Sequence, residues 1–168
     1  NRQAAASALA RAYLQSDLTV DERCAAEAAL TVLLDDPSPN VRLALAEALS
    51  ISHLAPIHIV AALASGHTEV ASMVLVRSPL LSDTDLIDRV ALGSDEVQCA
   101  IALRAQLSAT VCAAIAEVGC LQACAAMLQN EGAKIVSLSI RRIVERFGEE
   151  SAMRELLLPQ TTILTPNA

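Results

Sequence analysis

The chain has almost no aromatic residues and few helix breakers. Its 168 residues include no Trp, one Tyr and one Phe, together with five Gly and six Pro. The near absence of aromatics disfavours a single-stranded nucleic-acid groove, which usually needs stacking rings. Apolar residues make up 54% of the chain, which excludes intrinsic disorder. Since most of them are Ala, Leu and Val, and the breakers fall between apolar stretches, the composition predicts an all-α protein.

The chain is also poor in basic residues, and it lacks a convincing membrane span. Twelve Lys and Arg face nineteen Asp and Glu, so the net charge is −7. An acidic surface repels phosphate backbones, and nucleic-acid binding is therefore only an alternative here. The longest uncharged stretch, residues 48–68, contains three His, a Pro and a Gly. We interpret it as two buried helix faces, so no membrane partner is expected.

The five cysteines are odd in number and follow helix faces, without a Cys-x-x-Cys pair. This usage indicates free thiols in a reducing cytoplasm rather than a disulfide scaffold. An alternative is a metal or thiol site that gathers Cys99, Cys112, Cys120 and Cys124. Buried core thiols are the preferred interpretation, because free Cys is often buried. His53, His58 and His67 are poorly spaced for ligation, so we expect neither a metal nor a cofactor.

A two-part apolar unit occurs four times along the chain. Its first halves open at Val41, Val70, Val97 and Leu121, which are 29, 27 and 24 residues apart. The second halves carry apolar residues three and four apart, which places one stripe on each helix. Repeats of this length predict stacked helix pairs, each unable to bury its apolar face alone. The expected architecture is an α-solenoid of short antiparallel helix pairs.

The predicted organisation is a single helical-repeat domain over residues 1–159. Thr19 and Glu22 have the spacing of a capping box, and Ser82 has the position of an N-cap. The expected segments are N-terminal capping helices at 1–35, repeats at about 36–66, 67–93, 94–119 and 120–148, a terminal helix at 149–158, and a flexible tail or linker at 160–168. Within the repeats, helices are expected at about 40–50, 55–65, 68–77, 83–92, 95–105, 109–118, 120–129 and 134–147.

The first repeat resembles a HEAT repeat. Asp36-Pro37 is followed by Val41-Arg42, which is similar to the Asp-Pro turn and Val-Arg opening of a HEAT helix. The later repeats keep the turn and the Val but have Ala71 and Gln98 in place of Arg. The repeats are shorter than usual HEAT units, and closer in length to leucine-rich-variant repeats.

The chain also resembles a bacterial HEAT-like family filed as a domain of unknown function. Residues 126–133 and 140–146 carry most of this resemblance, which covers roughly residues 20–158. The resemblance implies an α-solenoid domain, often part of a longer protein, and it transfers no catalytic residue.

We predict a non-enzymatic protein–protein interaction or scaffolding module that binds through the repeat groove. No phosphate-binding loop, catalytic triad or His-Glu-x-x-His pattern is recognisable. A cluster of cations on the later second helices is the candidate binding surface for an unknown protein partner: Arg89, Lys134, Arg141, Arg142 and Arg146. Neighbouring glutamates could instead turn this cluster into a solvated face. The apolar C-terminal helix is a candidate for self-association.

Overall fold

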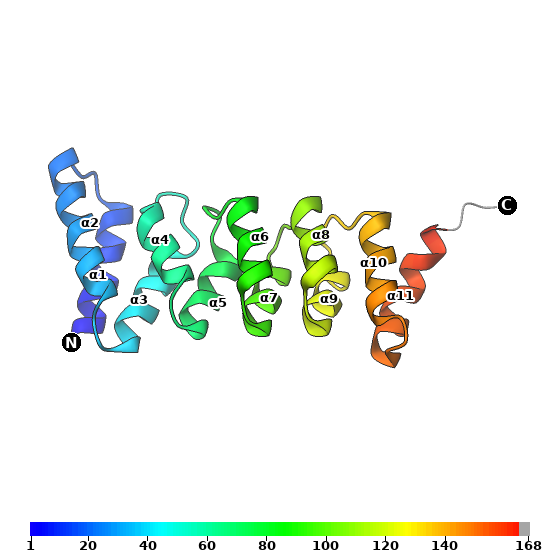
Figure 1. Ribbon diagram of the computed structural model, residues 1–168. Helices are drawn as coiled ribbons and strands as arrows, with labels where there is room; N and C mark the ends of the chain where they lie inside the picture. The colour runs from blue at the N-terminus through cyan, green and yellow to red at the C-terminus, as the bar shows by residue number, and fades with distance from the viewer. Residues whose placement is uncertain (165–168) are drawn as a thin grey trace. The chain divides into compact units, whose positions relative to one another are not determined.

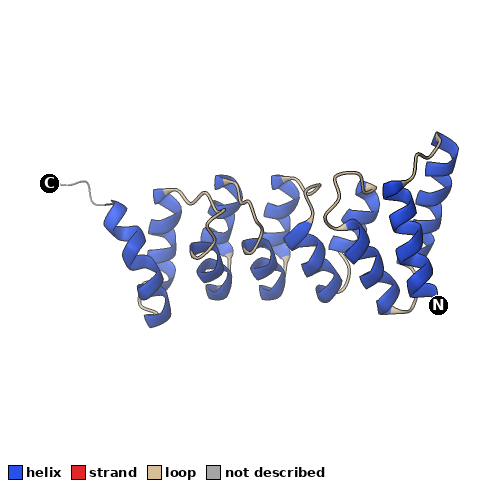
Figure 2. Ribbon diagram, turned by 180° about the vertical axis from the view of Figure 1, so that it is seen from behind, coloured by secondary structure: helices blue, strands red, loops and turns tan. Residues whose placement is uncertain are grey.

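Every helix or strand segment in the described part of the chain is an α-helix (Figures 1 and 2). The computed structural model describes the backbone of residues 1–164 and the side chains of residues 1–160. The prediction of an all-α protein is therefore confirmed. The eleven helices of this range are α1 (Arg2–Gln15), α2 (Val20–Leu34), α3 (Pro39–Leu49), α4 (Ile57–Ala64), α5 (Thr68–Arg77), α6 (Asp83–Leu92), α7 (Asp95–Ala102), α8 (Ala109–Val118), α9 (Leu121–Leu128), α10 (Ser137–Phe147) and α11 (Ser151–Leu164).

Local capping explains where several helices begin. The Thr19 hydroxyl accepts the backbone N–H of Glu22, whose carboxylate accepts the N–H of Thr19, so the predicted capping box of α2 is present. Ser82 and Asp85 form the same reciprocal pair at the start of α6. Such caps satisfy N–H groups that have no partner within the helix.

The chain divides into two compact units, residues 1–81 and residues 82–168. The boundary falls inside the predicted repeat 67–93, and the extent of a single domain over 1–159 stays a prediction. In the first unit, α3 packs against both α1 and α5, while α2 packs against α4. The helices predicted as N-terminal caps thus take the places of a further helix pair. The core of this unit includes Leu30, Leu45, Leu49, Ile59 and Leu75.

The second unit contains two rows of helices. In one row α8 lies between α6 and α10, and in the other α9 lies between α7 and α11 (Figure 1). Contacts of α6 with α7, α8 with α9, and α10 with α11 join the rows. The core between them includes Ile101, Ile115, Met127, Ile143 and Met153.

Two predicted helices in this unit are too long. The helix expected over 95–105 ends at Ala102, and the helix expected over 134–147 begins at Ser137. The reason is a pairing between the two connecting segments. Leu107 donates its N–H to the Gly132 carbonyl and accepts the N–H of Lys134, both at 3.0 Å. These bonds hold residues 133–136 outside the helix.

The predicted end of the last helix before Pro159 is wrong. Helix α11 runs from Ser151 to Leu164 with Pro159 inside it. A proline removes one helical N–H and crowds the preceding turn, but residues on either side can keep their own bonds. Residues 160–164 of the predicted flexible tail are therefore helical, and its last four residues lie outside the described range. Within the described residues, no helix combines the length and apolarity that a membrane span requires.

Candidate functional site

Arg142 of the predicted cation cluster is paired within the chain. Its guanidinium makes two bonds to the Glu117 carboxylate of α8, at 2.9 and 3.0 Å, and one bond to Glu145, at 3.1 Å. The hydrogen bonds to Glu145 and Glu117 raise the pKa of Arg142. The expected neutralisation by neighbouring glutamates is thus present at Glu145.

Arg146 serves a different purpose, because it caps the C-terminal end of α8. Its guanidinium donates to the carbonyls of Ala116 and Gly119, both at 2.7 Å. The same group lies over the Phe147 ring, 4.5 Å from the ring centroid. Carbonyls at a helix C-terminus lack helical partners and carry partial negative charge, so a cation is favourable there.

The other three predicted binding residues are dispersed. Arg141 is exposed on α10, and Lys134 is exposed in the segment before it. Arg89 is half-buried on α6. The structure therefore does not bring the five cations into one outward patch: Arg142 and Arg146 fasten α10 to α8, whereas Arg141 and Lys134 project. Their role in binding a ligand stays a prediction.

Two thiols from different helices lie together at the start of α9. Cys120 is the N-cap of α9, with its sulfur accepting the Ala123 N–H at 3.4 Å. The Cys120 sulfur lies 3.9 Å from the sulfur of Cys99 on α7. Cys124 is buried and donates to the Ile115 carbonyl at 3.3 Å.

Burial raises the pKa of Cys99 and of Cys124. Burial, with the neighbouring Cys120 as the next cause, raises the pKa of Cys99 to about 11. Burial likewise raises the pKa of Cys124 to about 11, although Arg146 opposes the shift. Metal ligation requires thiolates, which such shifts disfavour. Within the described part of the chain, no three His, Cys, Asp or Glu side chains are placed to hold a metal ion.

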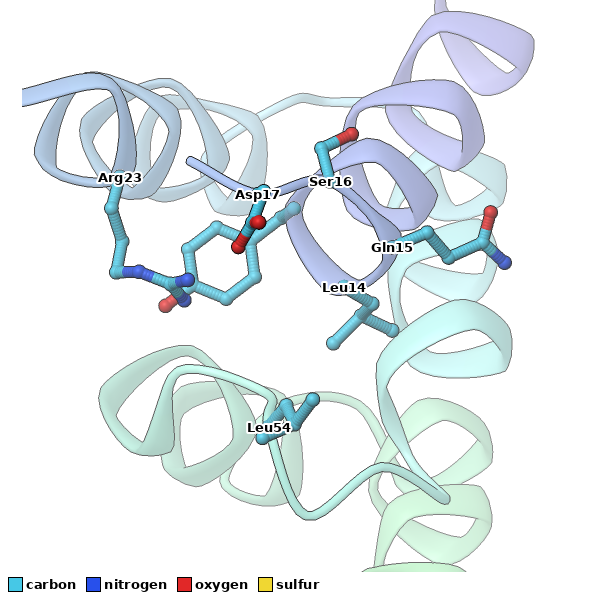
Figure 3. Close-up of a pocket in the computed structure, with 7 residues that line it drawn as sticks. Leu14, Gln15, Ser16, Asp17, Arg23 and Leu54 are labelled. Atoms are coloured by element: carbon cyan, nitrogen blue, oxygen red, sulfur yellow. The ribbon is translucent and has the colours of Figure 1, made fainter. Parts of the chain in front are cut away.

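A polar cleft in the first unit was not predicted from the sequence. It has a volume of about 380 Å³, and Tyr13, Asp17, Arg23 and Leu54 are among the residues that line it (Figure 3). Tyr13 is buried, and its hydroxyl donates to Glu27 at 2.6 Å. The Arg23 guanidinium lies 5.0 Å from the ring centroid. Burial and the bond to Glu27 raise the pKa of Tyr13, so this wall of the cleft is a neutral phenol held by two charged neighbours.

Residues 126–133, which carry much of the family resemblance, stabilise the end of α7. The Asn130 amide donates to the carbonyls of Ala102 and Arg104, at 2.8 and 2.7 Å, and thereby caps the end of α7. Its oxygen accepts the Gly132 N–H at 2.9 Å. A Cβ atom at Gly132 would lie 1.8 Å from the Ala105 carbonyl oxygen, so only glycine allows this approach.

Comparison with known families gives one match. Residues 70–163, more than half of the chain, match the model of DUF2336, described as an uncharacterised protein conserved in bacteria. The chain belongs to the DUF2336 family. The resemblance to a bacterial family of unknown function is therefore confirmed, over a shorter range at the N-terminal side than expected.

The DUF2336 match includes α6 to α10 completely. It therefore contains the bonds of Asn130 to the end of α7 and the contacts of Arg142 and Arg146. The Tyr13 cleft lies outside the matched residues. No curated protein and no solved structure matches the chain.

Proposed function

We propose that this DUF2336 chain is a non-enzymatic protein-interaction module made of HEAT-like helix pairs. Its docking surface is the outer face of α10 and α11, and the occupant is the same face of a second copy of the chain. The observation that carries the proposal is a change in burial along each row of the second unit. Positions that are covered in the earlier helices are uncovered in the last one.

The first row makes the comparison directly. The eighth residues of α6, α8 and α10 are Val90, Ala116 and Val144, and their exposed fractions are 0%, 1% and 39%. Helix α8 packs against α6, and α10 packs against α8. Among the described residues, no helix follows α10 in this row. Val144 is therefore an apolar residue that is partly exposed at a position that is buried in α6 and α8.

The second row shows the same change. The eighth residues of α7, α9 and α11 are Ala102, which is fully buried, Leu128, which is half-buried, and Leu158, which is 65% exposed. Leu158 lies on α11, which packs against α10, the helix of Val144. Large apolar side chains as exposed as Leu158 favour contact with another apolar surface. The two rows therefore support one docking face, defined by Val144 and Leu158.

Charge on this face supports a second copy as the occupant. Arg141 precedes Val144 by three residues, and Glu155 precedes Leu158 by three residues, so each lies on the same side of its helix as the apolar residue. Both charged side chains are exposed. In a two-fold dimer, α10 of each copy can pack against α11 of the other. This arrangement sets Arg141 of each copy against Glu155 of the other, so the face is complementary to itself.

Sedimentation over a concentration series tests the proposal. We expect the unaltered chain to form dimers in the micromolar range, and Val144→Glu with Leu158→Glu to weaken dimerisation at least about tenfold. Leu92→Glu is the matched control, because Leu92 is 89% exposed on α6, outside the docking face.

A charge exchange gives a second, independent readout. Arg141→Glu should weaken the dimer, and adding Glu155→Arg should restore it, because the exchanged pair keeps its complementarity. A chain that stays monomeric at all concentrations, or a dimer that none of these changes weakens, contradicts the proposed docking face.

A further inference from the structure

The thiols at the start of α9 lie together in a way that helix capping alone does not require. The helices α7 and α8 begin after Ser94 and Ser108, whose hydroxyls accept the N–H groups of Val97 and Val111. Cys120 occupies the corresponding place before α9. Serine is a preferred N-cap residue and a thiol sulfur is a weaker acceptor, so the cap itself gives no reason for cysteine.

We propose that Cys99 and Cys120 form a peroxide-sensitive modification site, in which the two thiols close to an intramolecular disulfide that ties α7 to the start of α9. Their sulfurs are 3.9 Å apart, and both residues are half-buried, so a small oxidant has access. A disulfide requires an S–S distance of about 2 Å.

The backbone between these thiols is already held in place. The Gln98 side-chain carbonyl accepts the Cys120 N–H at 2.8 Å, and the Gln98 amide donates to the Val90 carbonyl at 2.8 Å. Gln98 is itself buried. Gln98, the residue next to Cys99, thus holds the backbone of Cys120 close to Cys99, and the disulfide requires only that the two sulfurs approach further.

The order of the two steps follows from the surroundings of each sulfur. Cys120 lies at the N-terminal end of α9, where its sulfur accepts the Ala123 N–H and negative charge is favoured. Burial keeps Cys99 protonated at neutral pH, since its pKa is raised to about 11. Cys120 is therefore the thiol that reacts first, and Cys99 is the resolving thiol.

The chemistry balances with a peroxide as oxidant. The Cys120 thiolate attacks one peroxide oxygen, the O–O bond breaks, and a sulfenic acid forms as water or an alcohol leaves. The Cys99 sulfur then attacks the Cys120 sulfur, the S–O bond breaks, and hydroxide leaves with the Cys99 proton as water. Two thiols are oxidised to one disulfide, and one peroxide is reduced.

Thiol titration and peptide mapping test this site in the full chain. After treatment with hydrogen peroxide, we expect the reactive thiol count of the denatured protein to fall by two per molecule and to recover with dithiothreitol. Trypsin cleavage after Arg89, Arg104 and Lys134 places Cys99 on its own peptide, apart from the peptide that carries Cys120. Fragmentation of the cross-linked pair identifies the second cysteine among Cys112, Cys120 and Cys124.

Single substitutions provide the controls. Cys120→Ser keeps an N-cap oxygen and should abolish the disulfide without loss of helical signal. Cys99→Ala should leave Cys120 as a sulfenic acid that dimedone traps, and exposed Cys24→Ser should change nothing within the molecule. An unchanged thiol count, a Cys120–Cys124 bond, or dimedone labelling of Cys120 in the unaltered chain would overturn the assignment.

Discussion

Buried thiols near the junction of α8 and α9 make the stability of the chain sensitive to alkaline pH. The pKa of Cys124 is raised to about 11 in the folded chain, whereas an unfolded cysteine titrates near pH 8.5. A folded pKa above the unfolded one means that the folded state holds its proton longer. The stabilising contribution of this neutral thiol is therefore complete below about pH 8.5 and is lost as the pH rises through 11.

Urea unfolding under reducing conditions at pH 8 and pH 10.5 measures this effect. We expect the free energy of unfolding to fall between the two values, and to fall less in Cys124→Ala. Cys24→Ala is the control, because Cys24 is exposed and its replacement should leave the pH dependence unaltered. An equal fall in all three proteins would assign the alkaline loss to other groups.

The connection between α9 and α10 sets a requirement at the scale of whole elements. Gly132 lies where any Cβ would meet the Ala105 carbonyl, and Asn130 beside it caps α7. We expect Gly132→Ala to lower the free energy of unfolding by about 2 kcal/mol, because backbone on both sides must move. Chemical denaturation measures the loss.

Gly66→Ala is the matched comparison for this substitution. A Cβ at Gly66 would lie 3.4 Å from the nearest atom, the Leu63 carbonyl oxygen, which is an ordinary contact. We expect this change to be neutral or slightly stabilising, since alanine restricts the unfolded chain more than glycine does. Similar losses at both glycines would contradict the close approach at Gly132.

The arginines of α10 differ in what they contribute to stability: Arg146 donates to carbonyls at the end of α8, whereas Arg141 is exposed. Arg146→Met keeps the apolar stem but removes the donors to two carbonyls, so we expect a loss of about 2 kcal/mol. Arg141→Met, on the same helix but exposed, should change stability by less than about 0.5 kcal/mol when unfolding is followed at protein concentrations below those of dimerisation. Thermal and urea unfolding of both variants measure the two losses. An Arg146→Met variant as stable as the unaltered chain would contradict a stabilising role of Arg146 at the end of α8.

At the scale of the whole molecule, the second unit has a core of its own. Residues 82–168 bury apolar side chains from both rows of helices, among them Ile101, Ile115 and Ile143. We expect this fragment to fold alone and to unfold cooperatively in urea, as followed by far-UV circular dichroism. A fragment of residues 82–136, which lacks Ile143, Met153 and Leu157, should unfold at lower urea concentration and less sharply. An unfolded longer fragment would contradict an independent core.

Local sequence signals predicted most helix positions. The predicted bounds 68–77, 83–92 and 109–118 are those of α5, α6 and α8. Pro79 follows the end of α5, Ser82 caps the start of α6, and Gly93 and Gly119 follow the ends of α6 and α8. The signals failed where a distant segment intervened. No residue near Lys134 in the sequence indicates that the Leu107 carbonyl accepts the Lys134 N–H. Likewise, Pro159 predicts a helix end, but α11 continues through it.

The sequence by itself determined that this protein is all-α, that apolar helix faces recur along it, and that it resembles a bacterial family of unknown function. Apolar periodicity and helix caps depend on residues a few positions apart, so the sequence predicts them without knowledge of the packing between helices. Only the tertiary structure decided which side chains are satisfied internally and which are not. Arg142 binds Glu117 from 25 residues away, and Cys99 lies against Cys120 from 21 residues away. Such meetings depend on how the helices stack, because packing rather than spacing along the chain brings these atoms within bonding distance.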